Sequence, residues 1–151
     1  MFEGIGIQTI LGVLTTVGVG VTTPADCYVG LGAHDPGSTF DIDNPAGTLG
    51  CQADFNSIRV FAEHISSPAN GNDFPGINHA GAKFLLPLTS EVTTYAGASV
   101  AIPSKQLNGS PVLSMIGIEA GPDTVKFYSE YIISIDKPAD GMLTGGIKFI
   151  F

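Results

Sequence analysis

The chain of 151 residues is long enough for one domain, and 44% of its residues are hydrophobic. Six basic residues against 14 acidic ones give a formal net charge of −8, and no basic cluster occurs, which excludes nucleic acid as a partner. No Cys-x-x-Cys or Cys/His spacing suits zinc, and we expect neither a metal nor a cofactor.

The first 25 residues form an apolar segment whose only charge is Glu3. Its run at residues 5–21, followed by small residues, resembles a secretory signal peptide. The same run alternates aliphatic or β-branched residues with glycines, which also suits a β-arm that adds a strand to a neighbouring molecule. We therefore predict a signal-peptide-like segment or an N-terminal β-arm at residues 1–25, and a separate folded domain at residues 26–151.

From residue 27 onward, apolar residues alternate with polar or small ones at a period of two, which is typical of two-faced β-strands. The last strand shows the pattern most clearly, with Leu143, Ile147 and Phe149 on one face. Thr144 and Lys148 lie on the other face. Eight segments follow the pattern, at residues 27–34, 48–55, 58–66, 77–88, 93–102, 112–120, 125–135 and 140–151.

The links between these segments alternate in length. Short, turn-like links are expected at residues 56–57, 89–92 and 121–124. Longer links, rich in glycine, proline and polar residues, are expected at residues 35–47, 67–76, 103–111 and 136–141. This alternation predicts an all-β fold, an eight-stranded antiparallel up-and-down β-barrel at residues 26–151, with both of its ends on the short-turn side. Strands of roughly 9–11 residues also suit a tilted, transmembrane crossing.

The final strand ends on Phe151, and this ending resembles the closing strand of bacterial outer-membrane β-barrels, whose assembly machinery reads a terminal aromatic residue. The resemblance implies a location in the bacterial outer membrane, with the apolar faces turned to lipid. The charged residues of the opposite faces would then form an ion network inside the barrel. They are Arg59, Glu63, Lys83, Glu119, Lys126, Glu130 and Lys148. The alternative is a soluble β-sandwich, in which the same apolar faces pack between two sheets.

Cys27 and Cys51 are the only cysteines, and both lie on the apolar face of the first two predicted strands. A disulfide between them requires those strands to be neighbours in matching register. Two free thiols that serve as small hydrophobic residues are the alternative.

A His-x-Ser sequence at the end of the third predicted strand is the candidate for chemistry. His64 and Ser66 share the outward face, and Asn78 has the same parity at the start of the fourth strand, near the long-loop rim. A serine beside a histidine suits acyl transfer, since the imidazole takes the hydroxyl proton and a third group fixes its tautomer. Glu63 and His79 lie on the opposite face, where we interpret them as hydrogen-bonding partners inside the barrel.

This hairpin resembles the outer-membrane lipid A deacylases, small eight-stranded barrels that hydrolyse an acyl ester of lipopolysaccharide. The resemblance implies His64 as general base, Ser66 as nucleophile, and membrane lipid or lipopolysaccharide as partner. Asn78 stands where that family has an orienting glutamate. The chain departs from the family in this uncharged residue and in placing the pair outside the last hairpin. An ordinary strand exit at residues 66–68 is the simpler interpretation.

Two interpretations without enzymatic activity remain open. One is a barrel that binds a partner through acidic outer loops, whose residues are Asp35, Asp41, Asp43, Asp73, Asp136 and Asp140. The other is a soluble structural subunit of a virion or filament, in which the N-terminal segment inserts into a neighbour as a donor strand.

Overall fold

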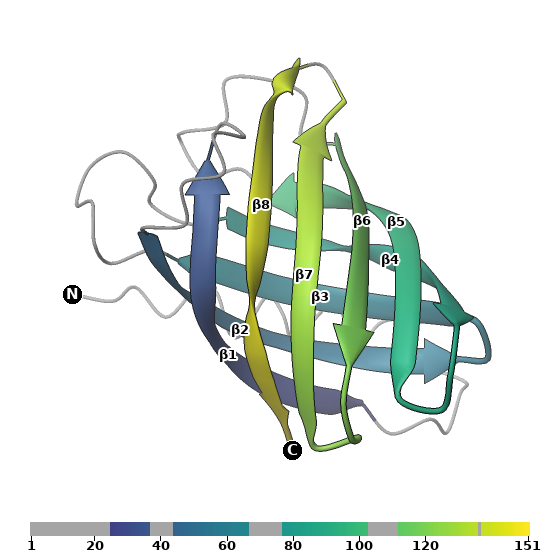
Figure 1. The fold of residues 1–151 in the computed structure, drawn as a ribbon. Helices are drawn as coiled ribbons and strands as arrows, with labels where there is room; N and C mark the ends of the chain where they lie inside the picture. Colours follow the sequence, from purple (N-terminus) through teal and green to yellow (C-terminus); the bar gives the residue numbers. More distant parts are fainter. Residues whose placement is uncertain (1–24, 37–43, 67–76, 103–111, 136) are drawn as a thin grey trace.

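The computed structural model describes residues 25–36, 44–66, 77–102, 112–135 and 137–151, which form a closed barrel (Figure 1). Each strand pairs antiparallel with the next in the chain, and the last strand pairs with the first. The predicted eight-stranded up-and-down barrel is confirmed. The strands are β1 (Asp26–Pro36), β2 (Asn44–Phe55), β3 (Ile58–Ser66), β4 (Ile77–Pro87), β5 (Val92–Ile102), β6 (Val112–Ala120), β7 (Val125–Ser134) and β8 (Lys137–Ile150).

The strands are strongly tilted with respect to one another. In Figure 1, β8, β7 and β6 run upright across the front, and β2 to β4 cross behind them at a steep angle. Such a tilt is what closing a sheet of few strands requires. Within the described ranges, no helix is long and apolar enough to cross a membrane.

Some of the sequence predictions concern parts of the chain outside the described residues. These are the signal-peptide or β-arm segment, at residues 1–24, and most of the acidic outer loops. In the longer links, residues 37–43, 67–76 and 103–111 lie outside the described residues.

The three short links form turns, as predicted. Asn56 has a φ of 56° in the two-residue turn between β2 and β3, and Gly121 has a φ of 124° between β6 and β7. Asparagine and glycine adopt such conformations more readily than other residues. Between β4 and β5, the Thr89 hydroxyl oxygen accepts hydrogen bonds from the backbone N–H groups of Glu91 (3.2 Å) and Val92 (3.0 Å). The C-terminus lies at the same end of the barrel as the β6–β7 turn (Figure 1).

The predicted long link at residues 136–141 is wrong, because β8 already begins at Lys137. Glycine and proline in this segment suggested a loop, but the β7–β8 ladder accommodates them through a register shift between Ile132 and Ser134. A Cβ atom at Gly141 would overlap the ring and hydroxyl group of Tyr131. The glycine therefore permits a close approach within a strand and does not mark a turn.

Cys27 and Cys51 lie directly opposite each other in the β1–β2 ladder and form a disulfide, with 3.9 Å between their Cα atoms. This answers the question that the sequence left open. Cys27 also exchanges two backbone hydrogen bonds with Phe151, at 3.1 and 2.9 Å. One residue therefore ties β1 covalently to β2 and, by hydrogen bonds, to the end of the chain after β8, where the barrel closes.

The outer surface of the barrel is apolar. Phe127 is 56% exposed and Phe149 is 46% exposed, so neither packs between two sheets. The closed topology and these exposed side chains exclude the β-sandwich. The exposed large hydrophobic residues are Val29, Leu31, Leu49, Ile58, Phe84, Leu86, Leu88, Val100, Ile116, Ile118, Phe127, Ile135, Phe149 and Phe151.

Candidate functional site

The predicted outer site is partly assembled. His64 and Asn78 are direct partners in the β3–β4 ladder, and 2.7 Å separates His64 Nδ1 from Asn78 Oδ1. With its Nδ1–H donated to this oxygen, the imidazole presents Nε2 as the basic nitrogen. Both side chains are partly exposed, and both lie at the end of the barrel opposite the short turns. The structure thus brings together the predicted base and its orienting residue.

Ser66 lies two residues further along β3, opposite Gly47 of β2. A Cβ atom at Gly47 would stand 3.5 Å from Ser66 Oγ, so the hydroxyl group lies over glycine backbone. Residues i and i+2 of a strand are about 6.5–7 Å apart at Cα. Among the described residues, the structure records no hydrogen bond between His64 and Ser66, and the serine's role as nucleophile stays a prediction.

Glu63 is the centre of an ion network inside the barrel. Its Oε2 accepts hydrogen bonds from the Tyr28 hydroxyl group at 2.7 Å and from Lys148 Nζ at 3.1 Å. Its Oε1 lies 3.2 Å from His79 Nε2. All four side chains are buried. The network therefore joins β1, β3, β4 and β8 across the interior, and the predicted pairing of Glu63 with His79 is confirmed.

A second buried ion pair joins β4 to β7, where Lys83 Nζ donates to Glu130 Oε2 at 2.5 Å. Lys83 Nζ also lies 4.5 Å from the ring centroids of both Phe61 and Tyr95. Lys148 is held in the same way between two tyrosine rings, at 4.6 and 4.3 Å. Aromatic faces attract ammonium groups most strongly where water is excluded. Each buried lysine thus has a carboxylate and two rings in place of solvent.

A third ion group surrounds Arg59 at the short-turn end. Its Nε and Nη2 donate to the two carboxylate oxygens of Asp54, at 2.7 and 2.9 Å. Its Nη1 donates to both oxygens of Glu119, at 2.8 and 2.9 Å. Lys126 lies nearer to solvent, where its Nζ donates to a backbone carbonyl of the β6–β7 link at 2.7 Å and lies 3.9 Å from Asp123.

The predicted charged interior is confirmed for all of its members except Lys126, which lies at the mouth of the barrel and pairs with Asp123, outside the predicted set. The confirmed residues are Arg59, Glu63, Lys83, Glu119, Glu130 and Lys148. Asp54 is absent from the predicted set, although its parity and the two-residue turn place it directly opposite Arg59. That register is the signal by which the pair could be found.

Ser99 is another residue that the sequence prediction does not include. Its Oγ lies 3.0 Å from His79 Nδ1, and Glu63 lies on the other side of the same imidazole. Serine, histidine and glutamate are the components of a hydrolase triad. Here, however, Ser99 is 3% exposed and faces the filled interior, where no substrate can reach it. We interpret the buried Ser99–His79–Glu63 contacts as structural.

In the described part of the chain, no three His, Cys, Asp or Glu side chains come together to hold a metal ion.

Comparison with known proteins finds no family model and no curated protein that matches the chain. Among solved structures, the chain is similar to one described as "De novo design of transmembrane beta-barrels", with 12% identity and a TM-score of 0.59 over 84% of this chain and 94% of that one. It is also similar to the solution NMR structure of the de novo designed TMB2.3, with 17% identity and a TM-score of 0.56 over 84% and 93% of the two chains. At such identities the likeness concerns the fold alone: the chain has the closed, all-antiparallel architecture of designed transmembrane β-barrels.

Proposed function

We propose that the chain is an integral protein of the bacterial outer membrane whose barrel is closed to solutes. The observation that carries this proposal is the inverted polarity of the wall, with exposed aliphatic and aromatic side chains outside and paired charges inside. An apolar outer band is what a bilayer requires of a barrel. The two-faced pattern of the last strand, with Leu143, Ile147 and Phe149 on its outer face, resembles outer-membrane closing strands and supports the choice of membrane.

Three measurements test this proposal. The folded protein should migrate differently in boiled and unboiled samples on a gel, and it should partition with outer-membrane vesicles when expressed in a Gram-negative bacterium. N-terminal sequencing of the recovered protein should begin at Asp26, since the proposal assigns residues 1–25 to export. Recovery of a stable, monodisperse protein in buffer without detergent would contradict a membrane location.

The filled interior gives a second expectation. Buried ion pairs and aromatic rings occupy the centre of the barrel, so no continuous aqueous path is expected. In planar lipid bilayers, the reconstituted protein should show no stepwise ion conductance. Reproducible single-channel steps would show that the barrel is a pore.

A second candidate function is hydrolysis of a lipid acyl ester at the outer rim, as the deacylase resemblance implies. The hydrogen bond between His64 and Asn78 favours it, because it fixes the tautomer in which Nε2 can accept a proton. Ser66 would be the nucleophile, and its contact with the base would tighten when substrate binds, as such contacts often do. The partner would be a glycolipid such as lipopolysaccharide.

The wall below this site is compatible with acyl chains. Val60 pairs with Ala82, which pairs in turn with Ala98, and all three face outward from neighbouring strands. Small aliphatic side chains leave a smooth outer surface along which an acyl chain could lie. This row of side chains crosses three neighbouring strands and starts four residues from His64 along β3.

The activity is tested by fatty-acid release from lipopolysaccharide in mixed micelles. Ser66→Ala should abolish release, whereas Ser129→Ala, which removes an exposed outward hydroxyl on β7, should leave it unchanged. Asn78→Asp should increase release, because a carboxylate stabilises the imidazolium that forms when the serine loses its proton. Equal release by the unmodified protein and Ser66→Ala would end the catalytic assignment and leave the barrel proposal intact.

A further inference from the structure

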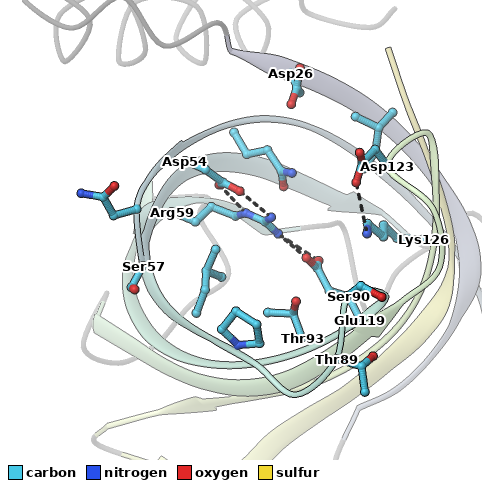
Figure 2. A pocket seen from close by; sticks show the side chains of 15 residues that line it. Asp26, Asp54, Ser57, Arg59, Thr89, Ser90, Thr93, Glu119, Asp123 and Lys126 are labelled. Carbon is cyan, nitrogen blue, oxygen red and sulfur yellow. Dashed lines mark hydrogen bonds and ion pairs between the residues drawn. The ribbon is translucent and has the colours of Figure 1, made fainter.

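A polar cavity of about 380 Å³ opens at the short-turn end of the barrel, away from the His64–Asn78 pair. Figure 2 shows Arg59 at its centre, reaching between Asp54 and Glu119. Small-molecule sites have volumes of roughly 300–1,000 Å³. The cavity is therefore large enough for a compact organic ligand, and nothing in the outer-rim chemistry uses it.

The cavity carries an excess of negative charge. Arg59 provides one positive charge for two carboxylates, Asp54 and Glu119, with which it forms four hydrogen bonds. Lys126 is the one other cation in the lining. The lining carboxylates are Asp26, Asp54, Glu119 and Asp123. Four carboxylates against two cations leave two negative charges unbalanced, and Asp26 and Asp123 carry theirs at the exposed mouth of the cavity.

Gln52 gives an independent indication of a ligand. It faces inward from β2, is only 8% exposed, and lines this cavity. Among the described residues, its side-chain amide forms no hydrogen bond with another residue, and it is not one of the fully enclosed polar atoms, so its donor and acceptor face the cavity. An amide in this position can form its hydrogen bonds with water or with a ligand that enters the cavity. Thr93 adds a hydroxyl oxygen to the same lining.

We propose that this cavity binds a small organic ammonium compound, of the size of a diamine or an amino sugar. An ammonium group donates three hydrogen bonds, for which the Gln52 carbonyl, the Thr93 hydroxyl and the remaining carboxylate lone pairs are acceptors. A bare metal ion fits less well, because the described residues hold no cluster of three ligating side chains. The ammonium group would neutralise part of the excess charge, and the rest of the ligand would fill the cavity.

The test is isothermal titration calorimetry on the full chain, refolded in detergent micelles. 1,4-Diaminobutane and glucosamine should each bind saturably at one site, whereas glucose, which lacks the ammonium group, should not bind. Calcium chloride is the control for an inorganic cation. Absence of saturable amine binding overturns the proposal. Equal binding of glucose, or saturable calcium binding that displaces the amines, would also overturn it.

Variants localise the site. Asp54→Asn should weaken amine binding about tenfold, as expected for loss of one charge-assisted hydrogen bond, and Gln52→Leu should also weaken it. Glu91→Gln is the matched control: it removes the same charge from an exposed turn at the same end, outside the cavity lining. Heat-modifiable gel migration verifies that each variant is folded. If Glu91→Gln weakens binding as much as Asp54→Asn does, the attraction is a general property of the acidic surface and the proposal fails.

Discussion

The interior charges of the barrel form a central group, made of the Glu63–Lys148 and Lys83–Glu130 pairs, and a terminal group around Arg59 at the short-turn end, and the two groups differ in charge balance. The central group places carboxylates against lysines that are enclosed by aromatic rings, and its members are buried. The terminal group has more carboxylates than cations, and it borders an open cavity. The difference indicates that the central group holds the barrel together, whereas the terminal group has charge left over for a ligand.

The largest expected effect is therefore at the central group. Glu63→Leu removes the acceptor for Tyr28, His79 and Lys148 at once, and leaves a lysine buried without its counter-ion. We expect a loss of about 3–5 kcal/mol in the free energy of unfolding, the range found when one partner of a buried pair is removed. Urea titration of the protein in lipid vesicles measures it. Glu91→Leu, at an exposed turn, should change the midpoint little, and an equal loss there would contradict a special role for Glu63.

At the short-turn end, we expect the disulfide to contribute more stability than the ion pairs. Cys27→Ser opens a covalent loop that spans 24 positions of sequence separation. In the chain-entropy account, closing a loop of this size stabilises the fold by about 3 kcal/mol. Unfolding of the Cys27→Ser protein, compared with unmodified protein under oxidising and reducing conditions, measures the effect. The unmodified protein in reductant should have the same free energy of unfolding as Cys27→Ser in oxidant. If the reduced, unmodified protein is as stable as the oxidised one, the disulfide does not stabilise this end.

Arg59→Met should have a smaller effect than Glu63→Leu. It leaves Asp54 and Glu119 without their cation, but Asp54 is half-exposed and both border the cavity, where water can hydrate them. We expect a loss of about 1–3 kcal/mol in the free energy of unfolding. The same urea titration decides the order of the two variants. A larger loss for Arg59→Met than for Glu63→Leu would reverse the comparison between the two ion groups.

The period-two pattern was sufficient to predict the strands and the direction in which most side chains point. Parity places Lys83 and Glu130 on one face of the sheet and Phe127 on the other without any knowledge of register, and the closed barrel then makes the charged face the interior. Contacts that depend on the register between two strands could be predicted less well. The disulfide requires Cys27 to face Cys51 in the β1–β2 ladder, and alternation alone leaves that alignment open.

The missed features have specific physical causes. Residues 136–141 have the composition of a loop, and no local pattern marks the register shift or the close approach of Tyr131 to Gly141 that accompany the start of β8. Ser99 lies far from His79 in sequence, so their contact depends on the β4–β5 pairing. The cavity depends on three turns that meet at one end of a closed barrel, and no local motif marks it. Parity predicted that His64 and Asn78 face the same way on neighbouring strands, and the structure pairs them.

The smallest effect is expected at Thr144, a buried residue whose hydroxyl oxygen has no hydrogen-bond partner in the described part of the chain. It lies opposite Glu130 in the β7–β8 ladder, and Glu130 Oε1 is likewise unsatisfied. Replacing an unpaired hydroxyl by a methyl group of similar shape removes a desolvation cost and breaks no bond, so Thr144→Val should leave the free energy of unfolding unchanged or slightly higher. Thr48→Val is the matched control, because the Thr48 hydroxyl group shares a hydrogen bond of 3.2 Å with Tyr128, and its loss should cost about 1 kcal/mol. If Thr144→Val destabilises the barrel more than Thr48→Val does, the Thr144 hydroxyl group has a partner in solution, and it gives the central network a second contact with β8 beside Lys148.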